Sequence, residues 1–119
     1  MYKLNLKHHF SAAHHLKLDY ESPCQKVHGH RWEVEVEIIT NMLNVNGMVI
    51  DFQRIKELID RFDHQDLNKI VEFNPTAENL AQYFHEKIGI MVNRKEVYAE
   101  TKVIVSESPD ASITYYEDE

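Results

Sequence analysis

Two histidines separated by a single glycine, His28-Gly29-His30, open an alternating segment of the chain, and the only cysteine, Cys24, lies four residues before the first of them. Side chains two positions apart on a strand point to the same face, so both imidazoles can reach one metal ion. A third candidate, His14, ends an earlier alternating segment. Three imidazoles with one open position are typical of catalytic zinc. The spacing therefore predicts a Zn²⁺ site.

The third ligand of this site has alternatives, because His8, His9 and His15 are close to His14 in the sequence. In an unbroken strand, His14 lies on the same face as Phe10 and is favoured for that reason. A β-bulge between them would shift the alternation and exchange the candidates. The third ligand is therefore expected to be His14, with its neighbours as the alternatives.

Cys24 has three possible roles at this distance from a metal. As a thiolate activated by the nearby charge, it would be a catalytic group. As a fourth ligand, it would close the site and make it structural. As an ordinary free cysteine, it would be a small buried residue. Spacing alone does not separate these roles.

Asp63-His64 places a carboxylate beside an imidazole in a segment that we expect to be a loop. An imidazole near Cys24 could take the thiol proton while the carboxylate orients the ring. The simpler interpretation is a solvated loop histidine.

Glu107 shares a face with Val103 and Val105, so an inward-facing strand surface ends in a carboxylate. A buried carboxylate needs a partner, and a ligand with paired N–H donors would supply one. The alternative is a carboxylate beyond the strand end, in solvent.

The composition limits the function classes. The 119 residues predict one domain, 1–119, and the formal net charge of −7 argues against nucleic-acid or anionic-membrane binding. One cysteine excludes an intrachain disulfide. We find no apolar run near the roughly 20 residues of a membrane span and no signal-peptide pattern. These features predict a soluble cytoplasmic protein.

The periodicity predicts an α+β fold with the order ββααββ. Alternation indicates strands, and helical spacing follows the expected N-caps Asp51 and Thr76. The second helix is expected to end at Gly89, and 63–68 is expected to be a loop. The predicted strands are 2–12, 31–40, 96–106 and a last segment through Ile113 and Tyr115.

A four-stranded antiparallel sheet with two helices on one face leaves a charged face and two open edges. On that face the acidic row Glu33, Glu35 and Glu37 is expected to lie against Lys3 and Lys7. Several copies that close their sheets into one barrel would remove the edges. We therefore expect a homo-oligomer.

Five segments resemble, in the expected order, the 6-pyruvoyl-tetrahydropterin synthase and 6-carboxy-tetrahydropterin synthase family. They span nearly the whole chain: FSAAHHL, CQKVHGH, DHQDLN, NPTAENLA and VSES. The resemblance implies a tunnelling fold, in which trimers form a barrel and two trimers stack into a hexamer, with active sites at subunit interfaces.

The resemblance also implies roles for individual residues. Cys24 would be the catalytic thiol, and Asp63 with His64 its activating pair. Glu107 would grip the pterin ring, with Thr76 and Glu78 as further pocket contacts. The implied zinc ligands are His14, His28 and His30.

The implied substrate is 7,8-dihydroneopterin triphosphate. The three residues between Cys24 and His28 resemble the carboxy branch, which makes 6-carboxytetrahydropterin, acetaldehyde and triphosphate for queuosine and 7-deazaguanine biosynthesis. The pyruvoyl branch, with a longer insert, is the second choice, and Cys24 counts against a third branch that uses glutamate. A non-catalytic module with a Cys-His₃ zinc site is the alternative from another class.

Overall fold

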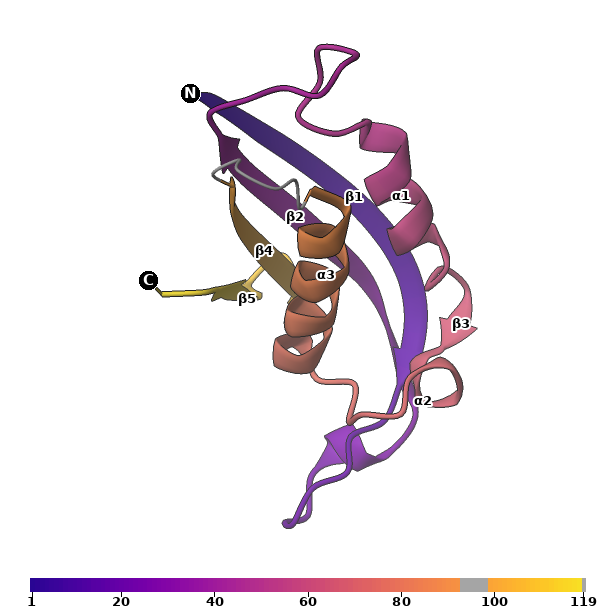
Figure 1. The fold of residues 1–119 in the computed structure, drawn as a ribbon. Helices are drawn as coiled ribbons and strands as arrows, with labels where there is room; N and C mark the ends of the chain where they lie inside the picture. Colours follow the sequence, from indigo (N-terminus) through magenta and orange to yellow (C-terminus); the bar gives the residue numbers. More distant parts are fainter. Residues whose placement is uncertain (93–98, 119) are drawn as a thin grey trace.

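The computed structural model describes residues 1–92 and 99–118 and consists of a curved sheet with helices on one face (Figure 1). The long strands are β1 (Tyr2–His14), β2 (His28–Thr40), β4 (Ala99–Ser108) and β5 (Ala111–Tyr116). The longer helices are α1 (Phe52–Asp60) and α3 (Ala77–Val92). Three short elements complete the fold, the 3₁₀ helix η1 (Pro23–Gln25), β3 (Gln65–Asp66) and α2 (Leu67–Ile70).

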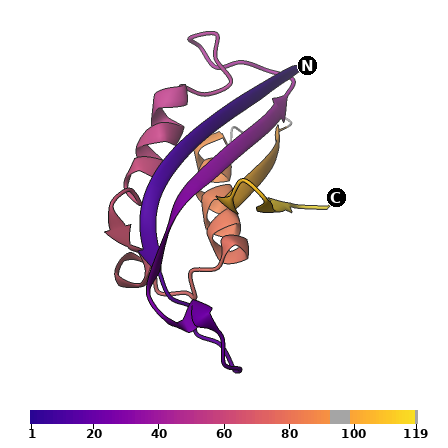
Figure 2. The ribbon, with the colours of Figure 1, turned by 180° about the vertical axis from the view of Figure 1, so that it is seen from behind.

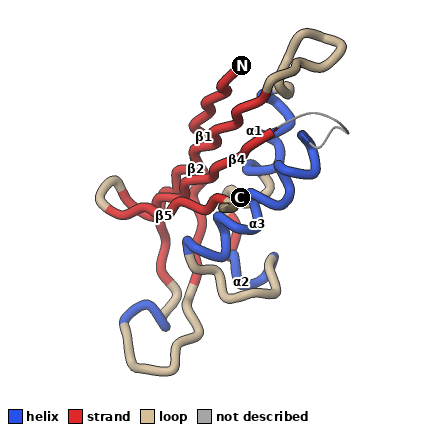
Figure 3. Tube along the Cα trace, turned by 60° about the vertical axis from the view of Figure 1, so that its left-hand side comes forward, coloured by secondary structure: helices blue, strands red, loops and turns tan. Residues whose placement is uncertain are grey.

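The sheet order is β3-β1-β2-β4-β5, and all neighbours are antiparallel except β1 and β3. The tube view shows two layers, with the sheet on one side and the helices on the other (Figure 3). Seen from behind, β1 and β2 lie in front of α3 (Figure 2). The predicted α+β class and the placement of the helices on one face are confirmed.

The core lies between the sheet and the helices, and strict alternation along β2 builds its sheet side. Trp32, Val34, Val36 and Ile38 are fully buried. The helix side comes from α1, where Asp51 caps the N-terminus by accepting the Gln53 N–H at 2.9 Å, and from the buried stripe of α3. Because one face of each element is apolar, burial fixes the register of the β1–β2 ladder.

The face of the sheet without helices carries the predicted charge pairing. Lys3 forms an ion pair with Glu37 at 3.2 Å, and Lys7 lies opposite Glu35 in the β1–β2 register. Within the described residues, no strand pairs with the outer edge of β5. The open edge expected from the sequence is therefore present in the single chain.

Three details differ from the sequence-based expectation. The 63–68 segment is not simply a loop, because Gln65–Asp66 pairs with β1 as a fifth, parallel strand and α2 follows directly. The sheet has five strands instead of four, and α2 is a third helix. Gly89 does not end α3, which continues to Val92. The expected strand start at 96–98 lies outside the described residues.

The described helices can be compared with a membrane-spanning helix in length and hydropathy. Among the described helices, none combines the length and the apolar character that crossing a membrane requires.

Candidate metal centre and catalytic groups

Three histidines converge where the β1–β2 ladder ends. The register places His14 opposite His28 and Ala12 opposite His30, so all three imidazoles lie on the face that carries the helices. One ligand nitrogen from each ring lies within 4.8 Å of the others. His14 is fully buried, and the other two are half-buried. This is the histidine cluster that the sequence predicts, and its three residues could hold a metal ion.

Backbone carbonyls orient two of these rings. The Nδ1–H of His14 donates to the Pro75 carbonyl at 2.8 Å, and that of His28 donates to the Lys26 carbonyl at 2.7 Å. Because a carbonyl only accepts, these contacts leave Nε2 as the nitrogen with a lone pair. Metal-binding histidines characteristically use their second nitrogen in this way. The chemistry of the donor set therefore fits a zinc ion.

Two ring nitrogens of the cluster are left without hydrogen-bond partners. Within the described residues, Nε2 of His14 and Nε2 of His30 are both buried and unpartnered. Leaving a buried acceptor unsatisfied costs about 1–3 kcal/mol. Burial lowers the pKa of His14, although the Pro75 carbonyl opposes the shift. The neutral imidazole that results is the form that binds a metal.

The alternative histidines have other contacts. His8 pairs with Asp60 at 2.6 Å, and His9 pairs with Glu33 at 3.0 Å on the opposite face. Asn68 bonds only the main chain of His15, and Nδ1 of its ring is buried without a hydrogen-bond partner among the described residues. The His15 ring nevertheless does not belong to the three-histidine group found in the described part of the chain.

Cys24 lies in η1, which a capping box between Ser22 and Gln25 stabilises. The Leu16 N–H donates to the Cys24 carbonyl at 2.8 Å and closes the connection between β1 and β2. The thiol is half-buried and is not a member of the three-histidine group found among the described residues. This geometry supports an open metal site over a closed Cys-His₃ site.

Two asparagines that the sequence analysis did not single out hold this loop. The side chain of Asn68 accepts the His15 N–H and donates to the His15 carbonyl, both at 2.9 Å. Asn74 makes the same pair of bonds with Lys17, at 2.9 and 3.0 Å. A carboxamide has both a donor and an acceptor, so it can replace a strand neighbour for one residue. Both asparagines lie in segments that the sequence analysis had quoted, DHQDLN and NPTAENLA, and this position was the signal that could have identified them.

Asp63 and His64 form a rigid unit beside β1. The Asp63 carboxylate accepts the Ser11 N–H at 2.8 Å and pairs with Nδ1 of His64 at 2.9 Å. The His64 N–H donates to the Ser11 carbonyl at 2.6 Å, and its φ of 58° is uncommon for a residue other than glycine. The Ser11 N–H, followed by the His64 ring, holds the pKa of Asp63 below its usual value. The pair can therefore present an oriented imidazole.

The His64 ring does not meet the Cys24 thiol in the single chain. Its side chain is 84% exposed, and its ring pairs with Asp63. Among residues 1–92 and 99–118, no hydrogen bond joins His64 to Cys24. The structure brings together the three histidines, and separately Asp63 and His64, but it does not join the two groups.

The predicted substrate-binding residues lie near the end of β4 and at the start of α3. Glu107 is half-buried near the end of β4, next to a register shift between Ser106 and Ser108, and its charge acts to raise the pKa of His14. Thr76 accepts the Asn79 N–H at 3.1 Å as the cap of α3, and Glu78 is exposed in the first turn.

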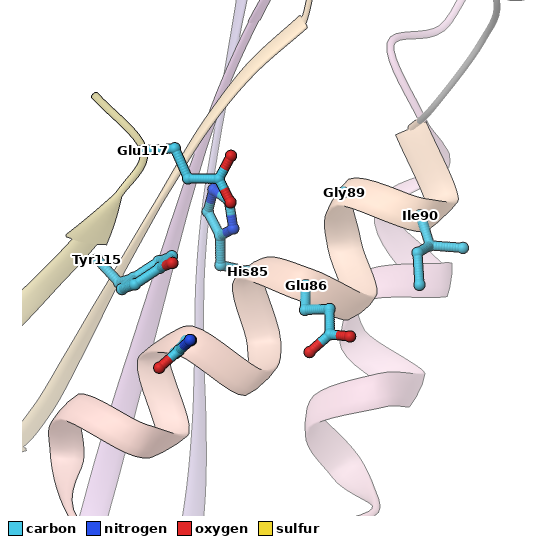
Figure 4. A pocket seen from close by; sticks show the side chains of 7 residues that line it. His85, Glu86, Gly89, Ile90, Tyr115 and Glu117 are labelled. Carbon is cyan, nitrogen blue, oxygen red and sulfur yellow. The ribbon is translucent and has the colours of Figure 1, made fainter. Parts of the chain in front are cut away.

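A separate pocket lies between α3 and β5 (Figure 4). Nε2–H of His85 donates to the Thr101 carbonyl at 3.0 Å, and the His85 ring packs edge-on against Tyr115. Glu117 lies beside the same ring (Figure 4). The pocket shares no residue with the histidine cluster.

Comparison with known proteins defines the class. The structure of Caenorhabditis elegans 6-pyruvoyl tetrahydropterin synthase superposes with a TM-score of 0.74 at 28% identity, over 98% of this chain and 96% of that one. The fold is therefore the tunnelling fold. The sequence matches the 6-pyruvoyl tetrahydropterin synthase family over residues 3–118, and the chain belongs to this family.

Two curated relatives belong to the carboxy branch by name. The 6-carboxy-5,6,7,8-tetrahydropterin synthase of Bacillus subtilis is 27% identical over 123 residues, which cover 96% of this chain and 84% of that protein. A protein of Archaeoglobus fulgidus, provisionally given the same name, is 40% identical over 95 residues, which cover 74% and 79%.

Proposed function

We propose that this protein is a zinc-dependent lyase of the 6-carboxy-5,6,7,8-tetrahydropterin synthase type, acting on 7,8-dihydroneopterin triphosphate in queuosine and 7-deazaguanine biosynthesis. The observation that carries the proposal is the cluster of His14, His28 and His30, in which unpartnered nitrogens face one point beside the Cys24 loop. The short spacing between Cys24 and His28, and the names of the curated relatives, favour the carboxy branch.

The three histidines would hold zinc, which when bound supplies Lewis-acid polarisation of the hydroxyl groups on the substrate side chain. Cys24, half-buried at the edge of the cluster, moves protons to and from the side-chain carbons. His64 exchanges protons with this thiol, and the ionised Asp63 keeps its ring oriented. Positioned acid–base groups of this kind each contribute about 10²–10⁴ in rate.

Glu107 binds the pterin ring in this proposal. A half-buried carboxylate is suited to accept paired N–H groups, such as the amino group and the ring N–H of a pterin. Thr76 and Glu78, at the start of α3, are proposed as further contacts to the pterin. The Thr76 hydroxyl accepts the Asn79 N–H with one lone pair, so it keeps its O–H donor and a second lone pair for a ligand.

The active site is completed by a second copy of the chain. Cys24 and His64 are not in contact within one chain, and the outer edge of β5 is unpaired among the described residues. Association of sheets into a trimeric barrel, and of two trimers into a hexamer, would pair the edges and bring His64 of one copy to Cys24 of another.

The test is to incubate the zinc-loaded protein with 7,8-dihydroneopterin triphosphate and to identify the products by mass spectrometry with an aldehyde trap. We expect 6-carboxytetrahydropterin and an equimolar amount of acetaldehyde. Formation of 6-pyruvoyltetrahydropterin without aldehyde would assign the pyruvoyl branch instead. Absence of turnover in the presence of zinc would favour the non-catalytic binding module.

X-ray absorption at the zinc edge separates the binding module from the enzyme. In a closed structural site, the Cys24 sulfur would be a ligand at about 2.3 Å. The membership of the histidine cluster, without Cys24, supports the open arrangement. We therefore expect a spectrum fitted by nitrogen and oxygen ligands alone.

A further inference from the structure

A hollow of about 570 Å³ lies on the face of the β1–β2 ladder opposite to the histidine cluster. Its floor includes two cross-strand pairs, Ser11 with Arg31 and Ala13 with Gly29, and the intervening Ala12 and His30 also border it. These residues alternate with Ala12, His14, His28 and His30, so their side chains point the other way. His64 forms the wall at the β3 edge. We call this the Arg31 hollow.

The glycine in the floor is not required by the fold. A Cβ added to Gly29 would meet only the Ala12 carbonyl oxygen, at 3.9 Å, which is ordinary contact. Its φ is not among the positive values of the chain. Glycine inside a strand weakens it and often marks a place where a ligand approaches the backbone closely. The space above Gly29 is therefore suited to a group from outside the chain.

Arg31 is an exposed cation without a partner in the part of the chain that is described. Two carboxylates from the segment that borders the hollow, Asp63 and Asp66, are already engaged in other hydrogen bonds. Asp63 holds the Ser11 N–H and the His64 ring, and Asp66 accepts the Asn68 N–H at 3.1 Å as the cap of α2. The guanidinium therefore remains available to an anion.

Arg31, Ser11 and His64 offer hydrogen-bond donors to the hollow, and the one lining carboxylate, Asp66, already caps α2. A guanidinium presents a planar fork of N–H groups that matches phosphate oxygens, and the Ser11 hydroxyl adds a donor on the paired position. His64, when protonated, supplies a further N–H next to them. A strongly anionic group is the ligand that matches the guanidinium fork best.

We propose that the Arg31 hollow is an oligophosphate subsite and that Arg31 is its specificity-determining residue. That the bound oligophosphate is the triphosphate group of the substrate rests on the proposed function. The hollow shares His64 with the catalytic groups, and in the proposed assembly His64 serves a neighbouring copy. Arg31 would thus hold the triphosphate of a substrate whose side chain lies at the metal of that neighbour.

Direct binding of inorganic triphosphate to the zinc-loaded protein, measured by calorimetry, tests the subsite. Replacing Arg31→Gln is expected to weaken binding about 10- to 100-fold, the loss that corresponds to a charged hydrogen bond of roughly 1.5–3 kcal/mol. Arg31→Lys keeps the positive charge but not the planar fork of N–H groups, so its affinity for triphosphate should lie between those of the parent and of Arg31→Gln. Arg54→Gln, on exposed α1 outside the hollow, is the matched control and should bind as the parent does. Equal affinity of Arg31→Gln and the parent would overturn the proposal.

Because triphosphate can also bind zinc, a metal-site variant is needed beside these. His28→Ala should still bind inorganic triphosphate with an Arg31-dependent affinity, since its ring points to the other face. Loss of all binding in His28→Ala, with full binding in Arg31→Gln, would place the anion at the metal and refute the subsite.

Kinetics separate this proposal from the proposed function. With the triphosphate substrate, Arg31→Gln should raise KM about 10-fold or more and leave kcat nearly unchanged, since the interaction is made equally before and during the reaction. An unchanged KM would contradict the subsite while leaving the enzyme assignment intact. If the parent shows no turnover but its triphosphate affinity depends on Arg31, the subsite stands and the enzyme assignment fails.

Discussion

The carboxylate of Asp63 accepts the backbone N–H of Ser11 at 2.8 Å, and so ties the candidate base to the edge of β1. The same carboxylate pairs with the His64 ring, and the His64 N–H returns to the Ser11 carbonyl. Three bonds thus fix a residue with an unusual backbone conformation. A conformation of this kind persists only where its surroundings determine it.

Replacing Asp63→Asn is expected to lower kcat by about 10² or more, because an amide does not fix the tautomer and orientation of the His64 ring as the carboxylate does. The zinc content should stay stoichiometric. Asp60→Asn is the control, since Asp60, the last residue of α1, pairs with His8 of β1 and forms no hydrogen bond with Ser11. Steady-state assays and metal analysis of both variants decide the point, and equal loss of activity in both would contradict it.

The lowered pKa of Asp63 predicts a pH dependence of stability. The folded value lies below that of the unfolded chain, so the stabilisation is complete above about pH 4, the ordinary Asp pKa, and is lost as the pH falls through the folded value. Denaturant melts from pH 7 to pH 3 should show a steeper acid-side loss for the parent than for Asp63→Asn. Parallel curves would show that the Ser11 contact is not maintained in solution.

Cys24→Ala is expected to abolish turnover and to retain one zinc per chain, because the thiol lies outside the histidine group in the described structure. Loss of the metal in this variant would instead make Cys24 a ligand and favour the structural site. Cys24→Ser, which keeps a hydroxyl of similar size, distinguishes lost proton transfer from altered packing.

His14→Ala is expected to lose zinc, whereas His15→Ala should keep it. His14 is fully buried with its ring in the cluster, and the structural role of His15 rests on backbone bonds to Asn68. A ligand that binds only the folded state stabilises it in proportion to RT ln(1 + [L]/Kd). A chelator should therefore lower the Tm of the parent and of His15→Ala but not that of His14→Ala. The reverse order would identify His15 as the ligand.

Local patterns predicted the parts of the fold that depend on alternation. Trp32, Val34, Val36 and Ile38 have a period of two that only a half-buried strand explains, and parity along the first strand pointed to His14. The expectations for 63–68 and for Gly89 failed for opposite reasons. Gln65–Asp66 is a strand only because it meets the free edge of β1, which is a tertiary contact. Gly89 has no structural role that requires it to end a helix.

The site followed the same division. Spacing could place His28 and His30 on one face, but the convergence with His14 depends on the β1–β2 register. The side chains of Asn68 and Asn74 bond main-chain groups more than 50 residues away, so the spacing of nearby residues could not predict these contacts. The separation of Cys24 from His64 within one chain was likewise invisible from spacing, and it leads to the most specific expectation about the assembly.

If the site is shared between copies, two inactive variants should restore each other. Cys24→Ala and His64→Ala, unfolded together and reassembled in equal amounts, would form some sites in which an intact Cys24 faces an intact His64 of a neighbour. Random assembly of a closed ring gives about one quarter of the sites this composition, so about a quarter of the parent activity should return. If both residues served the same copy, every site in the mixture would lack one of them. The mixture would then stay as inactive as its components, and the assignment of His64 to a neighbouring copy would be wrong.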